Sequence, residues 1–261
     1  MKRRLISDTP DWTIEEKINS TTGNAVRHYY FKRHLAVRIA LTSNAARRVS
    51  GLNLIEKDLR TIKIWSRMLR KELEHFGATP DSDEVIGFMP QGDEFYVSRA
   101  LYVSILATYG KMFTQAKGRG ISLKRDWVPD SHIETHDTVM KERHTFAAHS
   151  GEGSNEMCGI VLAIDYSPKN RTEPRIFSEL RQPTVMTLSM LASLDALVDA
   201  LHERVIDRLE RAVEHLYEEV TREFPEDRLR RIRRKAPKKL LRPIGPGDVI
   251  GAAPPHGKRA P

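Results

Sequence analysis

The sequence predicts a mainly α-helical protein, with a helical bundle, a small β-hairpin inserted before the last long helix, and a disordered basic C-terminal tail. Apolar residues recur at spacings of three and four over long segments, which is typical of amphipathic helices. Residues 225–261 hold eleven Lys/Arg, three acids and seven of the fourteen prolines, a composition that predicts disorder. We therefore expect an arm at 1–43, a bundle at 44–224 and a tail at 225–261.

The N-terminal arm gives mixed signals. Thr13 and Glu16 have the spacing of a capping box, which predicts a short helix at this point. Residues 25–43 are ambiguous, because Tyr29, Tyr30 and Phe31 suit a strand whereas the segment 35–41 suits a helix. The sequence alone leaves the structure of the arm open.

Three helices are expected in the first part of the bundle. The first runs from Asn44, as N-cap, to a stop at Gly77. Its apolar stripe consists of Ala45, Val49, Leu52, Ile55, Leu59, Ile62, Trp65, Leu69, Leu73 and Phe76. After a loop rich in proline and glycine, a second helix is expected over about 95–116. A third begins after Pro129 and ends near His149.

A β-hairpin at about 158–180 is expected before the last helix. One strand is rich in Ile and Val over 160–166, and a turn at 167–170 separates it from a partner strand at 175–180. The last helix opens at Pro183 and stops at Pro225. Its stripe suits core packing, with dimerisation as the second role, and consists of Leu194, Val198, Leu201, Val205, Leu209, Ala212, Leu216 and Val220.

Composition narrows the class of protein. The single cysteine, Cys158, excludes an internal disulfide and a multi-cysteine metal site, and we interpret it as a small buried residue. A reducing compartment fits this usage. No apolar run has the length of a signal peptide or of a membrane-spanning helix, so we expect a cytoplasmic protein without membrane contact. No metal or cofactor is expected.

The tail accounts for the whole formal net charge of +8, because residues 1–224 contain equal numbers of basic and acidic residues. Such a basic segment attracts polyanions without reading their sequence. Its alternative role is a solvated, flexible extension. The residues expected to bind nucleic acid, RNA in particular, are Arg230, Arg231, Arg233, Arg234, Lys235, Lys238 and Lys239.

The segment from Arg143 to Ser150 carries the most suggestive chemistry. An arginine offers a fixed fork of donors for phosphate oxygens, and a histidine can move a proton near neutral pH. Arg143 and His149 could therefore cleave RNA together without a metal, with His144 assisting. Four other pairs in the chain match Arg-x(4–6)-His, but only this one combines a polar second residue with alanines before the histidine.

This segment resembles the catalytic motif of the HEPN superfamily (higher eukaryotes and prokaryotes nucleotide-binding domains). Arg143, the polar His144 and the spacing to His149 are the residues that carry the resemblance. The resemblance implies a helical bundle that dimerises and a metal-independent ribonuclease whose two motifs face each other. It also implies a toxin or phage-defence role and a cognate antitoxin or another protein as partner.

Alternatives remain open for each of these residues. Arg143 and His149 could be a surface arginine and a histidine that stabilises the end of a helix. His132 and His136 have the spacing of a zinc site but lack an evident third ligand, so we interpret them as polar surface residues. The basic stretch 117–125, which includes Arg119, could line an anion-binding groove or form a solvated loop. A non-catalytic helical interaction or nucleic-acid-binding protein is the alternative function.

Overall fold

The structure is a computed structural model that divides into two compact units. One unit comprises Ser50–Leu209, and the other comprises Met1–Val49 together with Glu210–Pro261. We call them the helical unit and the sheet unit. The structure describes residues 2–9, 11–18, 21–22, 24–75, 93–115, 119–144, 157–164, 173–181, 186–235, 238–241 and 249–252.

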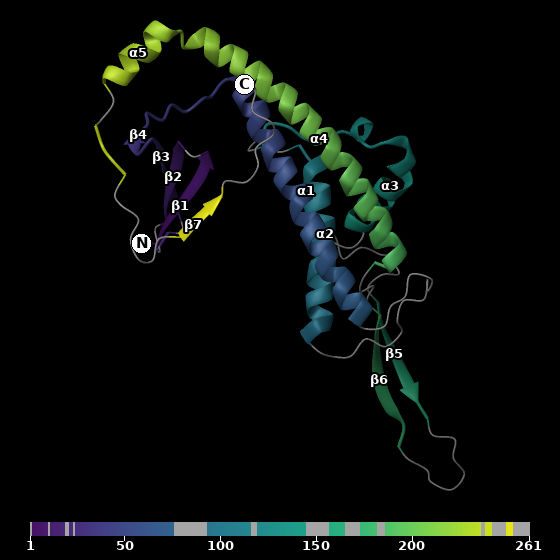
Figure 1. The fold of residues 1–261 in the computed structure, drawn as a ribbon. Helices are drawn as coiled ribbons and strands as arrows, with labels where there is room; N and C mark the ends of the chain where they lie inside the picture. Colours follow the sequence, from purple (N-terminus) through teal and green to yellow (C-terminus); the bar gives the residue numbers. More distant parts are fainter. Residues whose placement is uncertain are drawn as a thin grey trace. The chain divides into compact units, whose positions relative to one another are not determined.

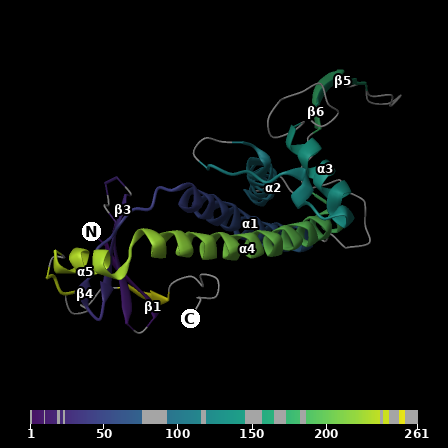
Figure 2. The same cartoon turned by 90° about the horizontal axis from the view of Figure 1, so that it is seen from above.

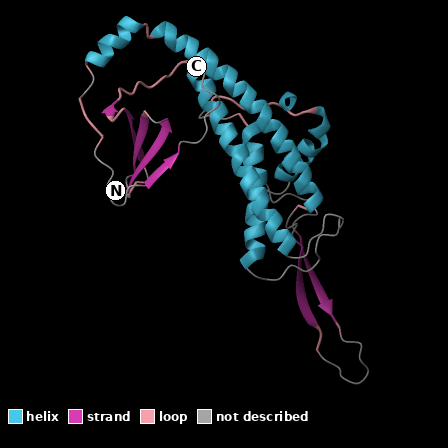
Figure 3. Cartoon of the chain, viewed as in Figure 1, coloured by secondary structure: helices cyan, strands magenta, loops and turns pink. Residues whose placement is uncertain are grey.

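The chain is mainly helical, as the apolar spacing predicts (Figures 1 and 3). The long helices are α1 (Asn44–His75), α2 (Asp93–Phe113) and α4 (Leu188–Glu223), and the shorter α3 spans Ile133–Glu142. Two 3-10 turns, Arg125–Trp127 and Asp130–His132, precede α3. Among the described residues, no helix combines the length and the apolar character needed to cross a membrane.

Apolar side chains at helical spacing form the core of the helical unit. The stripe predicted for the first long helix is buried in α1 as Leu52, Ile55, Leu59, Ile62, Leu69 and Leu73. The cap differs by one residue from the expected Asn44, because the Ser43 hydroxyl accepts a hydrogen bond from the Ala46 N–H at 3.2 Å. The facing stripe of α4 is buried as Leu191, Leu194, Leu197, Val198, Leu201 and Val205.

Helices α1 and α4 lie side by side (Figure 2), and polar contacts between them fix an antiparallel register. Arg70 near the end of α1 donates to Asp195 near the start of α4 at 2.6 Å, and the buried Ser66 hydroxyl donates to the same carboxylate. Towards the start of α1, Glu56 pairs with His202 at 3.3 Å. Because these partners ascend along one helix and descend along the other, the two helices run in opposite directions.

The predicted hairpin is present as β5 (Met157–Ala163) and β6 (Arg175–Arg181), paired antiparallel. Side chains directly opposite each other share a face, so Leu162 and Ile176 lie on one face with Ile160. Among the side chains that the structure describes, that face carries no charge, whereas the other face carries Arg175 and Glu179. Leu162 and Ile176 are 58% and 72% exposed, respectively, so the uncharged face is uncovered in the single chain.

The sheet unit contains a five-stranded sheet in the order β4-β3-β2-β1-β7. Its strands are β1 (Lys2–Thr9), β2 (Trp12–Ile18), β3 (Ala25–Phe31), β4 (His34–Leu35) and β7 (Val249–Ala252). Neighbouring strands pair antiparallel except β1 and β7, which pair parallel. The chain therefore brings its first and last described strands together in one sheet.

The short helix predicted for the arm is wrong. The capping-box residues Thr13 and Glu16 lie in strand β2, where the buried Glu16 carboxylate accepts a hydrogen bond from Arg27 across the sheet at 2.8 Å instead of capping a helix. The segment after Leu35, for which a helix was the open alternative, forms neither helix nor strand over residues 36–42. The strand expected at Tyr29, Tyr30 and Phe31 is present as β3.

The prediction of disorder is wrong for part of the tail. Glu226–Arg234 forms helix α5, in which ion pairs between residues four apart link Arg230 to Glu226 and Arg231 to Asp227. Residues 238–241 run beside β4, where the Leu35 N–H donates to the Lys239 carbonyl at 2.8 Å. Backbone pairing and these local ion pairs stabilise regular structure in the tail. The prediction of disorder used only composition, which does not show such contacts.

Candidate functional site

The candidate catalytic arginine lies at the end of α3. Arg143 directly follows α3 and keeps a helical conformation, and its backbone N–H reaches the carbonyls of Met140 and Val139. Its side chain is half-buried, and the next residue, His144, is exposed. His149, the third residue of the predicted site, lies outside the described residues. The structure therefore places two of the three predicted catalytic residues side by side.

Arg143 packs across a glycine of α2. A Cβ added to Gly110 would overlap Cδ and Nε of the arginine side chain, so the stem of Arg143 lies directly on the α2 backbone. Glycine in the interior of a helix costs about 1 kcal/mol relative to alanine. Sequence reasoning missed Gly110, although a glycine inside a predicted helix is a signal that another group approaches closely.

A buried tyrosine ties the end of α3 to α2. The Tyr102 hydroxyl donates to the Glu142 carboxylate at 3.1 Å, next to Arg143. Burial, followed by the charge and hydrogen bond of Glu142, raises the pKa of Tyr102 above its usual range, so the hydroxyl stays protonated and acts as a donor. Glu142 is thus held in place beside the arginine.

A second buried contact joins the same two helices. Tyr109 Oη and His136 Nδ1 lie 2.7 Å apart, and the Phe113 ring centroid lies 4.6 Å from that of the imidazole. His136 was expected at the surface, but it is buried because it lies on the apolar face of α3 with Val139. Desolvation lowers the pKa of His136, which favours the neutral imidazole.

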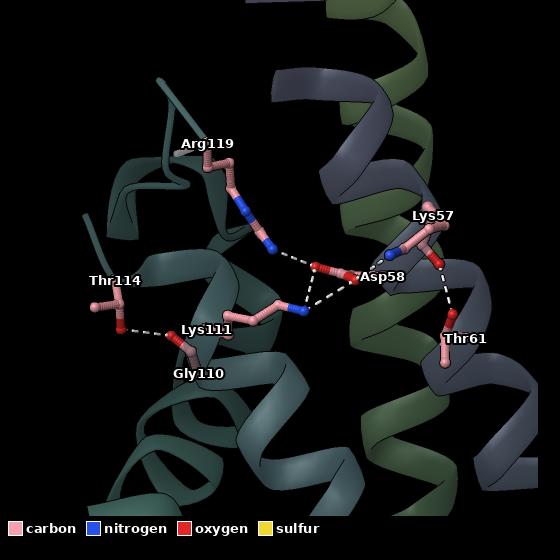
Figure 4. Close-up of polar contacts among 7 residues, drawn as sticks. All are labelled: Lys57, Asp58, Thr61, Gly110, Lys111, Thr114 and Arg119. Carbon is pink, nitrogen blue, oxygen red and sulfur yellow. Dashed lines mark hydrogen bonds and ion pairs between the residues drawn. The ribbon is translucent and has the colours of Figure 1, made fainter. Parts of the chain in front are cut away.

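Two arginines of the basic stretch at 117–125, Arg119 and Arg125, are engaged with carboxylates. Arg119 Nη2 lies 2.5 Å from Oδ2 of the buried Asp58, and Lys111 Nζ lies 3.1 Å from the same atom (Figure 4). Arg125 makes a two-pronged contact with Asp137, which raises the pKa of the guanidinium and lowers that of the carboxyl. Lys117 lies outside the described residues. Arg119 is therefore a packing residue rather than part of a solvated loop or an open anion-binding groove.

The cations predicted to bind nucleic acid lie on the surface of the sheet unit. Arg230, Arg231 and Arg233 are exposed on α5, where each pairs with Glu226 or Asp227. Exposed pairs of this kind are weak, so a phosphate can compete for the guanidinium groups. The other four predicted residues are also exposed, namely Arg234, Lys235, Lys238 and Lys239.

The described residues contain no group of three His, Cys, Asp or Glu side chains positioned to hold a metal ion. His132 ends a 3-10 turn and His136 faces Tyr109 and Phe113. Comparison of the chain with protein-family models, curated proteins and solved structures finds no match. The features that bear on function are therefore the motif and the contacts around it.

Proposed function

We propose that this protein cleaves RNA without a metal ion, using Arg143, His149 and an assisting His144. One observation carries the proposal: Arg143 is half-buried across Gly110 at the end of α3, with the exposed His144 directly after it. A solvated surface arginine would not need a glycine beneath its stem. The HEPN-like motif supports the same assignment, and with it a cytoplasmic toxin or phage-defence role opposed by a cognate antitoxin.

The chemistry follows from the two residue types. A histidine acting as base takes the proton of the RNA 2′-hydroxyl, whose oxygen attacks the adjacent phosphorus. The bond from phosphorus to the 5′-oxygen breaks, and that oxygen receives a proton from a histidine acting as acid. The guanidinium of Arg143 stabilises the negative charge that develops on the phosphoryl oxygens. The products carry a 2′,3′-cyclic phosphate and a 5′-hydroxyl.

A homodimer is part of this proposal, and the hairpin supports it. Its exposed face contains Ile160, Leu162 and Ile176, none of which is charged. This face can therefore pack against the same face of a second chain without repulsion between like charges. An isolated two-stranded hairpin is marginally stable in water, so a second copy would also support the strands. Ile160→Lys with Leu162→Lys should shift the protein to a monomer in analytical ultracentrifugation.

The test is digestion of RNA by the full chain in EDTA, with analysis of the ends. We expect 2′,3′-cyclic phosphate products from the natural sequence. Arg143→Ala and His149→Ala should each lower the rate at least about a hundredfold, the usual scale for loss of such a group. Arg125→Ala with His132→Ala is the matched control, because this pair has similar spacing but Arg125 is engaged with the exposed Asp137.

The outcomes separate two functions. If both single variants cleave at the natural rate, the catalytic assignment is wrong. The second candidate is binding of nucleic acid without cleavage, which the exposed cations of α5 favour. Retention of RNA by a protein that never produces cyclic phosphate ends would support that second function.

A further inference from the structure

An aromatic stripe lies on one face of the five-stranded sheet. Trp12 on β2 is directly opposite Phe31 on β3, and Tyr29 shares their face because it lies two residues before Phe31. The ring centroids of Trp12 and Phe31 are 5.2 Å apart. Their residues are 37% and 41% exposed, respectively, so both are partly open to solvent.

Cations border the stripe on two sides. Arg27 lies on the same face of β3, two residues before Tyr29; its side chain is 56% exposed, and its Nε is paired with the Glu16 carboxylate on that face at 2.8 Å. Lys32 follows Phe31 directly, and its Nζ lies 5.5 Å from the centre of the Phe31 ring. Lys32 and Arg33 are both exposed. The sheet therefore combines exposed rings with positive charge within a few residues.

The turn that carries two of these cations has an unfavourable backbone. Lys32 and Arg33 form the two-residue loop between β3 and β4, and both have positive φ values, 45° and 69°. Glycine and asparagine suit these positions, whereas side chains with long stems are disfavoured there. Two basic residues therefore occupy positions where Asn-Gly would fold more easily, and this unfavourable choice is consistent with a role for their charges.

The tail runs beside the same turn, with Lys239 on the opposite face of the sheet from Phe31, because His34 is opposite both Phe31 and Leu240. The Leu241 N–H donates to the Arg33 carbonyl at 2.7 Å, and the Leu35 N–H donates to the Lys239 carbonyl at 2.8 Å. These bonds hold the exposed Lys239 beside β4. The basic tail, which contains no aromatic residue among its charges, is thus joined to a sheet that does.

We propose that this face of the sheet binds single-stranded nucleic acid. Bases stack on Trp12 and Phe31, while Lys32 and Arg33 contact the phosphates. Rings that can stack with any base, combined with flanking cations, are the usual means of binding a single strand regardless of its sequence. A duplex buries its base faces against one another, so it cannot use the rings. The inference concerns binding alone and is independent of whether the helical unit cleaves RNA.

The proposal can be tested with the full chain and a fluorescein-labelled oligo(dT) of about 12 nucleotides, a length typical of such sites. A deoxy strand lacks the 2′-hydroxyl, so cleavage cannot consume it. Anisotropy should give tighter binding to the single strand than to the same strand paired with oligo(dA). Phe31→Ala and Phe31→Leu should each weaken binding about tenfold. Tyr217→Ala, which removes an exposed aromatic ring from α4, is the control and should leave affinity unchanged.

A turn variant distinguishes loss of contact from loss of folding. Lys32→Asn with Arg33→Gly should preserve or raise the unfolding temperature, because Asn-Gly suits this turn. It should nevertheless weaken binding and reduce the slope of log affinity against log salt by about 1.4, the value for two lost phosphate contacts. Lys71→Asn with Arg67→Gln removes two exposed charges from α1 and should preserve the slope.

Tryptophan fluorescence reports stacking directly. Oligo(dT) should quench the emission of the natural protein, and Trp12→Phe should abolish this quenching. Equal affinity for duplex and single strand, or an unchanged affinity of both Phe31 variants, would overturn the proposal. Capture of the protein by vesicles of phosphatidylserine and phosphatidylcholine with the same dependence on Phe31 and Lys32 would also overturn it, since the face would then bind membrane surfaces.

Discussion

The two units place their charges differently. In the helical unit, Asp58 is buried and its charge is met by Arg119, and Asp195 receives hydrogen bonds from Ser66 and Arg70. In the sheet unit, Lys32 and Arg33 lie exposed beside aromatic rings. The contrast teaches that charge in the first unit mainly fixes packing, whereas the charges of Lys32 and Arg33 in the second unit lie exposed at a turn. Arg143 is the exception within the helical unit, since it is half-buried next to an exposed histidine.

The largest expected effect is on the buried carboxylate of the helical unit. Asp58→Ala should lower the free energy of unfolding by about 3–5 kcal/mol, because it leaves Arg119 buried without its partner. The Arg119 side chain is only 10% exposed, and its Nη1 has no hydrogen-bond partner in the part of the chain that the structure describes. Urea denaturation measures the change.

Asp137→Ala provides the comparison for that result. Asp137 pairs with Arg125 at 2.7 Å, but both side chains are more than half exposed. Water screens such a pair, so its loss should cost less than about 1 kcal/mol. Equal destabilisation by Asp58→Ala and Asp137→Ala would show that burial does not increase the contribution of the Asp58 contact to the free energy of unfolding.

The next effect concerns the glycine beneath the candidate arginine. Gly110→Ala should destabilise the protein by about 1–3 kcal/mol, since the new methyl group overlaps the Arg143 stem. In an Arg143→Ala background the same change should become neutral or favourable, because alanine is the better helix former. A double-mutant cycle from thermal unfolding measures this coupling, and additive effects would show that the two residues do not touch.

A pH-dependent effect follows from the buried histidine. Desolvation lowers the pKa of His136 in the folded chain below its value of about 6.5 in the unfolded chain. The unfolded chain therefore takes up the proton first as the pH falls below about 6.5, and the free energy of unfolding decreases until the pH passes below the folded pKa. Denaturation at several pH values should show this fall, and His136→Gln should reduce it.

The smallest effect is expected on α5 of the sheet unit. Asp227→Ala removes the exposed partner of Arg231, which should change stability by no more than about 0.5 kcal/mol. Release of the guanidinium should leave nucleic-acid affinity equal or higher at low salt. A large loss of stability would show that the ion pairs of α5 are structural, and the contrast between the units would weaken.

The sequence predicted those parts of the fold that local spacing determines. The stripes of α1 and α4 and the hairpin β5–β6 were found because their signals lie within one segment. The five-stranded sheet was missed, since β1 pairs with β7 across more than two hundred residues and no periodic pattern records that pairing. The spacing of Thr13 and Glu16 predicted a helix wrongly for the same reason, because the partner of Glu16 lies on another strand.

The candidate site shows the same division. Arg143 and His144 could be predicted because the motif is contiguous along the chain. Gly110, Tyr102 and Asp58 could not be assigned their roles, since their partners lie 33, 40 and 61 residues away, respectively. The aromatic pair escaped notice because Trp12 and Phe31 become neighbours only when β2 pairs with β3.

One pair of variants tests the separation of the two units most directly. Cleavage and binding are measured on the same RNA in EDTA for Arg143→Ala and for Lys32→Asn with Arg33→Gly. We expect Arg143→Ala to lose cleavage at least a hundredfold and keep its affinity within about threefold. The turn variant should lose affinity but cleave at the natural rate when RNA is saturating. Parallel loss of cleavage and affinity in both variants would contradict the account.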